Sequence, residues 1–120
     1  VRSEIAWYPT DVWRWLLASQ WHLIGNTEPL LGRTLEAGDQ RGARLLTVKL
    51  CRLIMQMAFL QERRYWLYDK WLGTAFAELE AATDLGPLID TAMEQAPTIG
   101  AGSAVSRAMI TLGRAACPWR

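Results

Sequence analysis

The segment from residue 39 to residue 65 constrains the fold more than any other part of this sequence of 120 residues. Its apolar residues recur at helical spacing and surround most of the circumference of a helix, while the polar ones project in one narrow stripe. The apolar set is Leu45, Leu46, Val48, Leu50, Leu53, Ile54, Met55, Met57, Ala58 and Leu60. The polar stripe is Arg41, Lys49, Arg52, Gln56 and Arg63. A helix of this kind is packed on several sides, so we expect it at the centre of a helical bundle.

A first long helix is predicted over residues 10–26. Thr10 is its expected N-cap, and Asp11 complements the positive end of the helix dipole. Apolar and polar residues gather on opposite faces of this helix at about 100° per residue. Gln20 falls in the middle of the apolar face. Its side chain therefore needs a hydrogen-bond partner inside the bundle.

Pro29 removes one backbone donor, so we expect the first helix to kink or break near Thr27. Residues 30–37 are predicted to form a second helical piece. Gly38 is expected to close that piece, and Asp39 to cap the central helix that follows.

The remainder of the chain also shows helical periodicity. A third helix is predicted over residues 69–81. Thr83-Asp84 is the expected cap of a short fourth helix, which tolerates Pro87 in its first turn. Residues 97–103 are expected to form a Gly-rich break, and residues 104–116 a last, weakly amphipathic helix.

These elements predict an all-α fold. We expect an antiparallel helical bundle of four to five helices, with the first long helix kinked near Pro29. Residues 1–96 would form the helical bundle domain. Residues 97–120 would add the Gly-containing break and a C-terminal helix whose packing the sequence does not define.

Composition and charge are those of one globular domain. The sequence is 51% hydrophobic and 21% charged, which argues against disorder. The formal net charge is +1, so no bulk field attracts the chain to nucleic acid or to an acidic membrane. Neither is an expected partner, and any anion binding must be local.

The two cysteines, Cys51 and Cys117, lack metal-type spacing and fit a reduced, cytoplasmic protein. No run reaches the roughly 18 apolar residues that a membrane span needs. We expect no membrane segment. The sequence begins with Val1 rather than Met, as a processed protein or an excised fragment would.

The sequence motifs of common enzyme classes are absent. His22 is the only histidine, and no Gly-x-Ser-x-Gly motif presents a serine. No cluster has the spacing of zinc ligands, and no P-loop or dinucleotide motif occurs. Gly102-Ser103 is not followed by the Asp-x-Asp that a nucleotidyltransferase uses to bind its metal. We therefore assign no catalytic residue and no metal ligand, and as an independent enzyme the chain looks incomplete.

Cations gather where the central helix is expected to end. Arg63, Arg64 and Lys70 could contact a phosphate or carboxylate, Arg with bidentate geometry and Lys as a point charge. The alternative is structural: the same cations favour a helix C-terminus and could form salt bridges with Glu62 and Asp69. The sequence leaves both interpretations open.

Aromatic residues are interleaved with these cations. They are Tyr65, Trp66, Tyr68 and Trp71. Such rings could stack on a base, an interaction worth about 1–3 kcal/mol. They could equally close the end of the bundle by burying large apolar areas.

Four further aromatic residues lie near the start of the chain: Trp7, Trp13, Trp15 and Trp21. Trp13 and Trp15 project in different directions from a helix, so some of the four must face outward. An exposed tryptophan on a helix suggests an interface with another domain or subunit. We predict that these four residues mark such an interface.

His22 lies on the polar face of the first helix. It could act as a general base oriented by Asp11 or by a carboxylate of a partner. The alternative is a solvated histidine without a catalytic role.

Several of these motifs resemble a known family, the domain of unknown function 4037. The resemblance covers about residues 8–93. It is carried by Tyr8-Pro9-x-Asp11-Val12-Trp13, Leu17-Ala18-Ser19-Gln20-Trp21, Gly38-Asp39 and Glu62-Arg63-Arg64-Tyr65…Tyr68-x-Lys70-Trp71-Leu72-Gly73-Thr74-Ala75-Phe76. That domain forms the helical C-terminal part of bacterial proteins whose N-terminal part is nucleotidyltransferase-like.

The resemblance implies a helical bundle packed against a catalytic-type αβ domain, where it helps to shape a nucleotide and substrate cleft. The positions that carry over as substrate- or nucleotide-binding are Arg63, Arg64, Tyr65, Tyr68, Lys70 and Trp71. No cofactor belongs to this chain itself. Mg²⁺ and a nucleoside triphosphate would be bound if a catalytic domain is supplied.

Three functions follow as hypotheses. The leading one is a non-catalytic module that positions substrate or nucleotide for a nucleotidyltransferase-like domain. The first alternative is a purely structural or self-associating helical bundle. The less favoured alternative is a HEPN-type ribonuclease or toxin, whose sites place an Arg four to six residues before a His. No Arg stands at that distance before His22.

Overall fold

The structure is a computed structural model that describes residues 7–66, 68–96 and 99–115. These residues form helices and connecting turns, and contain no strand. The helices are α1 (Thr10–Glu36), α2 (Gln40–Gln61), α3 (Asp69–Phe76), α4 (Ala82–Gln95) and α5 (Ile99–Ala115). The predicted all-α bundle of four to five helices is confirmed.

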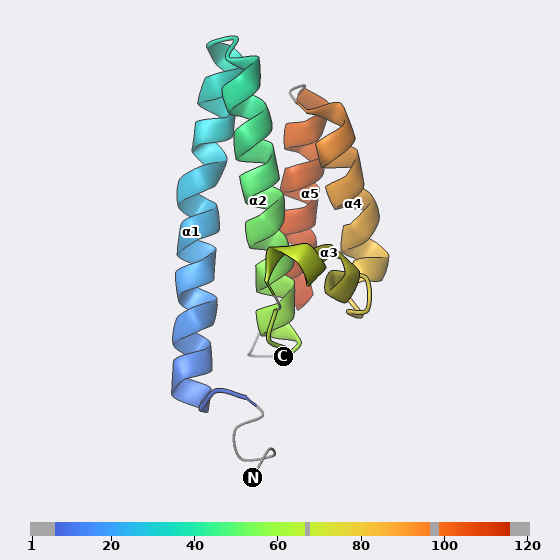
Figure 1. The fold of residues 1–120 in the computed structure, drawn as a ribbon. Coiled ribbons are helices and arrows are strands. Elements are labelled where there is room, and N and C mark those ends of the chain that lie inside the picture. The colour runs from blue at the N-terminus through green and yellow to red at the C-terminus, as the bar shows by residue number, and fades with distance from the viewer. Residues whose placement is uncertain (1–6, 67, 97–98, 116–120) are drawn as a thin grey trace.

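The helices are arranged as two antiparallel hairpins, α1–α2 and α4–α5 (Figure 1). Helix α2 contacts α1 on one side and the α4–α5 hairpin on the other. Short α3 crosses beside the lower half of α2 and leads into α4. None of the helices that the structure describes combines the length and the apolar character that a bilayer span requires.

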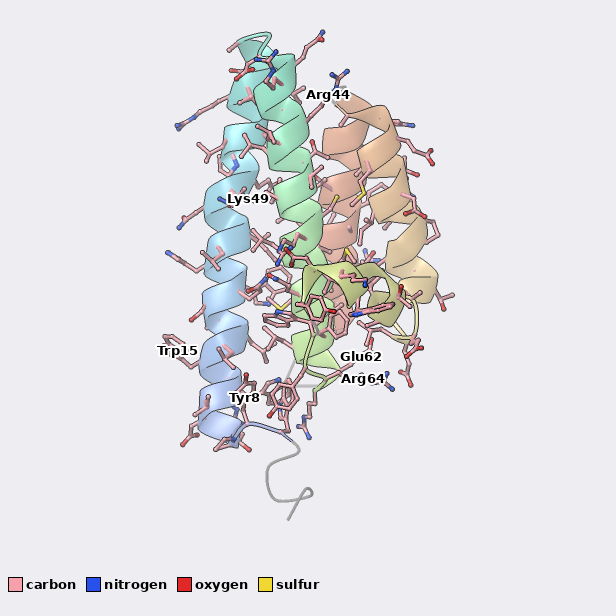
Figure 2. All side chains as sticks on the ribbon, viewed as in Figure 1. Tyr8, Trp15, Arg44, Lys49, Glu62 and Arg64 are labelled. Atoms are coloured by element: carbon pink, nitrogen blue, oxygen red, sulfur yellow. The ribbon has the colours of Figure 1, made fainter. Side chains whose placement is uncertain are left out.

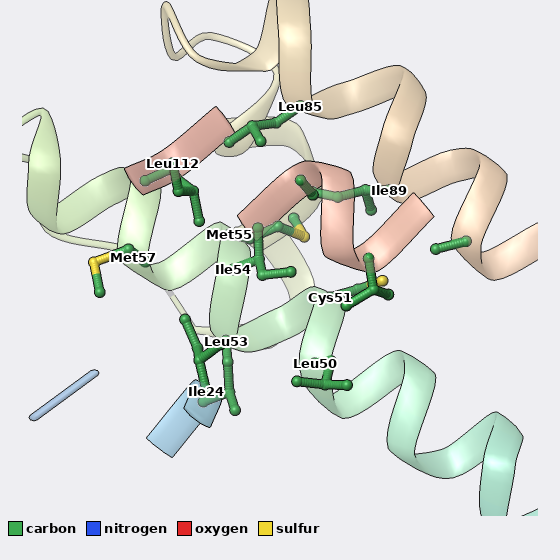
Figure 3. Close-up of a cluster of buried hydrophobic side chains, with 14 of the residues drawn as sticks. Ile24, Leu50, Cys51, Leu53, Ile54, Met55, Met57, Leu85, Ile89 and Leu112 are labelled. Atoms are coloured by element: carbon green, nitrogen blue, oxygen red, sulfur yellow. The ribbon is translucent and has the colours of Figure 1, made fainter. Parts of the chain in front are cut away.

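The core is built around α2, as predicted. Figure 3 shows Ile54 and Met55 of α2 facing Leu85 and Ile89 of α4 and Leu112 of α5. On the side of α1, Ile24 and Leu31 complete the same cluster. Burial of a large aliphatic side chain contributes about 1.5–3 kcal/mol, so this contiguous cluster dominates the stability of the bundle.

Two residues that we expected in the packed set of α2 are exposed instead. Leu45 is 68% and Val48 is 54% accessible. Both lie at helical angles next to the polar stripe that contains Arg41 and Arg52. The exposed face of α2 is therefore wider than the stripe of charged residues alone.

Helix α1 is continuous through Pro29, so the expected break and the separate second helical piece are wrong, while the kink near Pro29 stays a prediction (Figure 1). The proline ring crowds the carbonyl four residues earlier, at Gly25. Gly25 has no side chain and is exposed, so its carbonyl can turn to water. The buried stripe of Ile24, Thr27 and Leu31 continues across the proline and holds the helix together.

Buried polar groups on α1 and α2 are satisfied. The Gln20 amide donates hydrogen bonds to the Leu53 carbonyl at 2.9 Å and to Gln56 Oε1 at 3.3 Å. This confirms that Gln20 has a partner inside the bundle. Thr27 and Thr47 donate to carbonyls one turn earlier in their own helices. Such pairing removes the cost of burying an unpaired polar group.

The turn between α1 and α2 follows the sequence signals closely. Gly38 adopts a positive φ of 73°, the conformation that favours glycine at a helix end. Asp39 caps α2, as predicted, by accepting a hydrogen bond from the Gly42 amide at 2.9 Å. A Cβ at Gly42 would clash with that carboxylate, so a larger residue there would force the Asp39 side chain to move. At the start of α1 the N-cap is Pro9 rather than Thr10.

Helix α2 ends at Gln61, earlier than the predicted Tyr65. The Arg63 amide donates to the Leu60 carbonyl and the Arg64 amide to the Phe59 carbonyl. This is the Schellman arrangement, which requires a left-handed residue just after the helix. Arg63 occupies that position with φ of 57°. A non-glycine residue there costs about 1 kcal/mol, so other contacts must hold Arg63 in place.

Helices α3 and α4 also differ from the expected bounds. Helix α3 ends at Phe76, and turns over residues 77–81 lead into α4. Helix α4 begins at Ala82, so Thr83-Asp84 lies within its first turn and does not cap it. The turn before α4 is held instead by Glu62, whose carboxylate accepts hydrogen bonds from the amides of residues 80 and 81 at 2.9 Å each. A partner this distant in sequence has no local signal.

Helix α5 begins at Ile99, so the expected break is wrong for residues 99–103. Residues 97–98, which the expected break also included, lie outside the described residues. Buried residues of α5 join the core: Ala104, Val105, Ala108 and Leu112. The division at residue 96 stays a prediction.

The Glu62 contact generates a stability prediction. Glu62→Ala leaves two backbone amides in the turn before α4 without their charged acceptor, so the free energy of unfolding should fall by about 1–2 kcal/mol. Urea denaturation followed by circular dichroism measures the change. Glu78→Ala is the matched control, since that side chain is exposed in the same turn. An equal loss in both variants would contradict the role given to these hydrogen bonds.

Candidate functional site

The candidate site lies at the open end of the α1–α2 hairpin, opposite the turn at Gly38. Residues 7–8 precede α1 and residues 62–66 follow α2, and the antiparallel packing brings the two segments together. Figure 2 shows Tyr8 and Arg64 at this same end of the bundle.

Three aromatic rings from these segments contact one another. The centroids of Trp7 and Tyr8 are 5.0 Å apart, those of Trp7 and Tyr65 4.8 Å, and those of Tyr8 and Tyr65 5.1 Å. Their planes are inclined by 52–69°, the edge-to-face geometry in which a pair contributes about 0.5–1.5 kcal/mol. The indole Nε1 of Trp7 is buried without a hydrogen-bond acceptor among the described residues.

These rings line a cavity of about 200 Å³. We call its lining residues the aromatic corner: Trp7, Tyr8, Leu60, Arg64, Tyr65 and Trp66. Small-molecule sites usually enclose about 300–1,000 Å³, so the cavity is large enough for one planar ring and too small for a whole nucleotide. Among the residues that the structure describes, Arg64 is the only charged one in the lining. The arrangement can stack a ring and pair with an anion beside it.

Arg63 has a different environment from its neighbour. Its guanidinium carbon lies 4.3 Å from the centroid of the Trp13 ring. The same indole donates a hydrogen bond from Nε1 to the Leu60 carbonyl at 2.6 Å. A cation–π contact at an exposed site contributes about 0.5–1 kcal/mol, which offsets much of the cost of the left-handed backbone at Arg63. Arg63 and Trp13 therefore fasten α1 to the end of α2.

The remaining predicted binding residues form a second group at the start of α3. The Trp71 indole donates a hydrogen bond to the Tyr68 hydroxyl at 2.9 Å, and Lys70 Nζ lies 5.0 Å from the Trp71 ring centroid. Asp69 forms an ion pair with Arg52 of α2. The six predicted residues thus divide among three places, and only Arg64 and Tyr65 line the aromatic corner.

The salt bridges expected between these cations and Glu62 or Asp69 are not formed in the part of the chain that the structure describes. Glu62 binds backbone amides at residues 80 and 81, and Asp69 pairs with Arg52. Neither carboxylate is paired with the three cations that the sequence places beside it. Arg63 and Lys70 rest on indole rings instead.

Sequence reasoning missed Tyr8 and Leu60 as lining residues and assigned Trp7 only to an interface. The usable signal was the register of the hairpin. A tight turn at Gly38 places residues whose numbers sum to about 74 opposite each other, as Gln20 and Leu53 are. Continuing that register pairs residue 8 with the residues just after α2.

The four tryptophans of the predicted interface have unequal exposure. Trp15 is 68% accessible and points away from α2 (Figure 2). Trp13 and Trp21 are partly buried, and Trp7 is partly buried in the aromatic corner. Trp15 is therefore the one member of this set that offers a large free surface.

His22 is exposed, and its ring nitrogen shares a hydrogen bond with the Asn26 side chain at 3.0 Å. Asp11 lies eleven residues earlier on the same helix, which corresponds to about 16 Å. It therefore does not orient the ring. Among the residues that the structure describes, no group of three or more His, Cys, Asp or Glu side chains is placed to hold a metal ion.

A second cavity lies on the other side of α2, between α2, α3 and α4, and has a volume of about 510 Å³. Asp90 of α4 is part of its lining. Cys51 is buried close by (Figure 3). Burial, and secondarily the negative charge of Asp90, raise the pKa of the Cys51 thiol from its ordinary value of 9.0 to about 11. The thiol is therefore protonated and unreactive in the folded protein.

The model of one protein family, described as a domain of unknown function (DUF4037), matches residues 1–72. This is more than half of the chain, so the chain belongs to this family. The match ends before Gly73-Thr74-Ala75-Phe76, earlier than the resemblance predicted. It contains α1, α2 and the whole aromatic corner. No curated protein and no solved structure matches the chain.

The Cys51 environment predicts a dependence of stability on pH. Because the folded pKa is raised, the neutral thiol stabilises the fold fully below pH 9, and this contribution is lost as the pH rises from 9 through 11. In a Cys117→Ser background, we expect the unfolding free energy relative to Cys51→Ala to fall by about 2 kcal/mol over that range. Denaturant titrations at several pH values measure it. A difference that stays constant with pH would contradict this prediction.

Proposed function

We propose that this chain is a non-catalytic helical module whose aromatic corner forms one wall of a nucleotide- or substrate-binding cleft. The observation that carries the proposal is the small cavity that aromatic rings line together with Arg64. A base can stack on such rings, and Arg64 can pair with a phosphate or carboxylate attached to it.

The size of the cavity supports a shared site. About 200 Å³ accepts one ring but leaves the rest of a nucleotide outside. In this proposal the second wall comes from a nucleotidyltransferase-like domain, which also supplies the catalytic groups, Mg²⁺ and the nucleoside triphosphate. The chain itself contributes binding and orientation.

The family match also supports the assignment of this role to the corner. Residues 1–72 include both segments that meet there, whereas α4 and α5 lie beyond the match. We therefore assign the function common to the family to the α1–α2 hairpin and to the residues at its open end, which form the aromatic corner. The second group, around Tyr68 and Lys70, lies within the same match and flanks the corner.

Ligand-observed saturation-transfer NMR tests the proposal on this chain. We expect adenosine and ATP to bind weakly, at millimolar concentration, with saturation on the purine ring. Arg64→Gln should weaken ATP binding about tenfold, because it removes a charge-assisted hydrogen bond, and leave adenosine unchanged. Lys70→Gln is the matched control, as that cation rests on Trp71 outside the cavity.

Two results would overturn the nucleotide part of the proposal. One is the absence of saturation on the purine ring at millimolar ATP. The other is an equal loss of ATP binding in Arg64→Gln and Lys70→Gln, which would show attraction by surface charge alone.

A second candidate function is self-association through α1. Four exposed apolar side chains fall within ~80° of one another around this helix. They are Val12, Trp15, Leu23 and Leu30. A row of this kind is typical of an interface with another chain, and in this candidate the partner is a second copy.

Light scattering after size-exclusion chromatography distinguishes this candidate. If the row is a dimer interface, the chain should elute with twice its monomer mass, and Trp15→Glu should return it to the monomer. Ile110→Glu is the control, since Ile110 is an exposed apolar residue on α5. A monomer at every concentration tested would exclude self-association.

A further inference from the structure

The cavity between α2, α3 and α4 has the size of a small-molecule site. Its volume of about 510 Å³ lies within the range of 300–1,000 Å³ that is usual for such sites. It is separate from the aromatic corner and shares no lining residue with it. The family match ends before most of its walls.

The walls of this cavity are apolar and open. Met55, Phe76 and Ile89 contribute large apolar side chains from three different helices. Gly73 of α3 and Gly86 of α4 also line the cavity, and a Cβ on either would meet no atom within 4 Å. Gly73 is exposed and Gly86 is partly exposed, so the cavity is open to solvent at these two positions.

The apolar lining of this cavity includes a single charged residue, Asp90, among the residues that the structure describes. Asp90 is exposed, so it lies at the mouth. It forms no ion pair with any residue that the structure describes. Helix α4 carries two further acidic residues, Asp84 and Glu94, and no Lys or Arg.

The negative charge of Asp90 also acts on a buried group, the thiol of Cys51. It contributes to raising the pKa of Cys51, which is buried beneath the cavity. Among the residues that the structure describes, no Lys or Arg lines the cavity beside Asp90 or pairs with it. The field at the mouth of the cavity is therefore negative, and it favours a cation.

We infer that this cavity binds a small apolar ligand that carries one ammonium group. The apolar part lies against Met55, Phe76 and Ile89, and the ammonium group pairs with the Asp90 carboxylate at the mouth. Gly86 lies one helical turn before Asp90 on the same face of α4, so its lack of a side chain leaves room for the chain of the ligand beside the carboxylate.

Methyl NMR of the protein labelled at its methionines tests this site directly. The probe is 4-phenylbutylammonium, and 4-phenylbutanol is its uncharged counterpart. We expect the ammonium compound to shift the signals of Met55 and Met93, which line the cavity, and not that of the fully buried Met57, which does not. The alcohol should bind more weakly at the same place.

Variants then separate the charge from the cavity. Asp90→Asn should weaken binding of the ammonium compound about three- to tenfold without affecting the alcohol, while Glu94→Gln, on the same helix outside the cavity, should change neither by more than about twofold. Gly86→Leu fills the open space and should abolish binding of both. Circular dichroism checks that it keeps its helices, and if it does not, the Asp90 comparison decides.

The inference is overturned by any of three results. These are no shift at Met55 and Met93 with millimolar ammonium compound, equal affinity for the ammonium compound and the alcohol, or equal losses in Asp90→Asn and Glu94→Gln. Each is independent of whether the aromatic corner binds a nucleotide.

Discussion

The burial of α2 is the constraint on which the rest of the structure depends. Leu50, Phe59 and Leu60 are almost completely buried at widely separated angles around this helix, so α1 and the α4–α5 hairpin must pack against it simultaneously. Neither α1 nor the α4–α5 hairpin alone would cover this surface. The exposed strip of α2 that remains includes Leu45 and Lys49, and neither α1 nor the α4–α5 hairpin covers it.

The end of α2 determines where the other elements go. Glu62 turns outward to the amides before α4, and Arg63 turns back onto Trp13 of α1. The end of α2 therefore fixes both α1 and the segment that leads into α4. The left-handed backbone at Arg63 lets the side chains of Glu62 and Arg63 point to these two different elements. Arg64, the next residue, is then free to line the aromatic corner.

The sequence was sufficient where the controlling contacts are local or periodic. The central position of α2, the cap at Asp39 and the need of Gln20 for a partner all follow from spacing and from elementary hydrogen-bond accounting. Continuity through Pro29 was missed because Gly25, four residues earlier, makes the proline tolerable.

The site was predictable only in part, because its members meet through tertiary contacts. Arg64 and Tyr65 were identified from a cluster of cations and aromatics, but Tyr8 enters the site through the register of the hairpin. The contact that precedes α4 likewise joins the Glu62 carboxylate to an amide donor 18 residues away. No local propensity encodes such a pair.

The position of the aromatic corner within the α1–α2 hairpin has a consequence for its dynamics. Two helices joined by a tight turn separate most readily at their free ends, so the free energy of local opening should decrease from Gly38 towards Trp13 and Leu60. The corner occupies this free end, where the contact of Arg63 with Trp13 and the hydrogen bond from Trp13 to Leu60 oppose the opening. A partner or ligand that binds there would add to these contacts, and its effect would be transmitted along both helices as slower amide exchange.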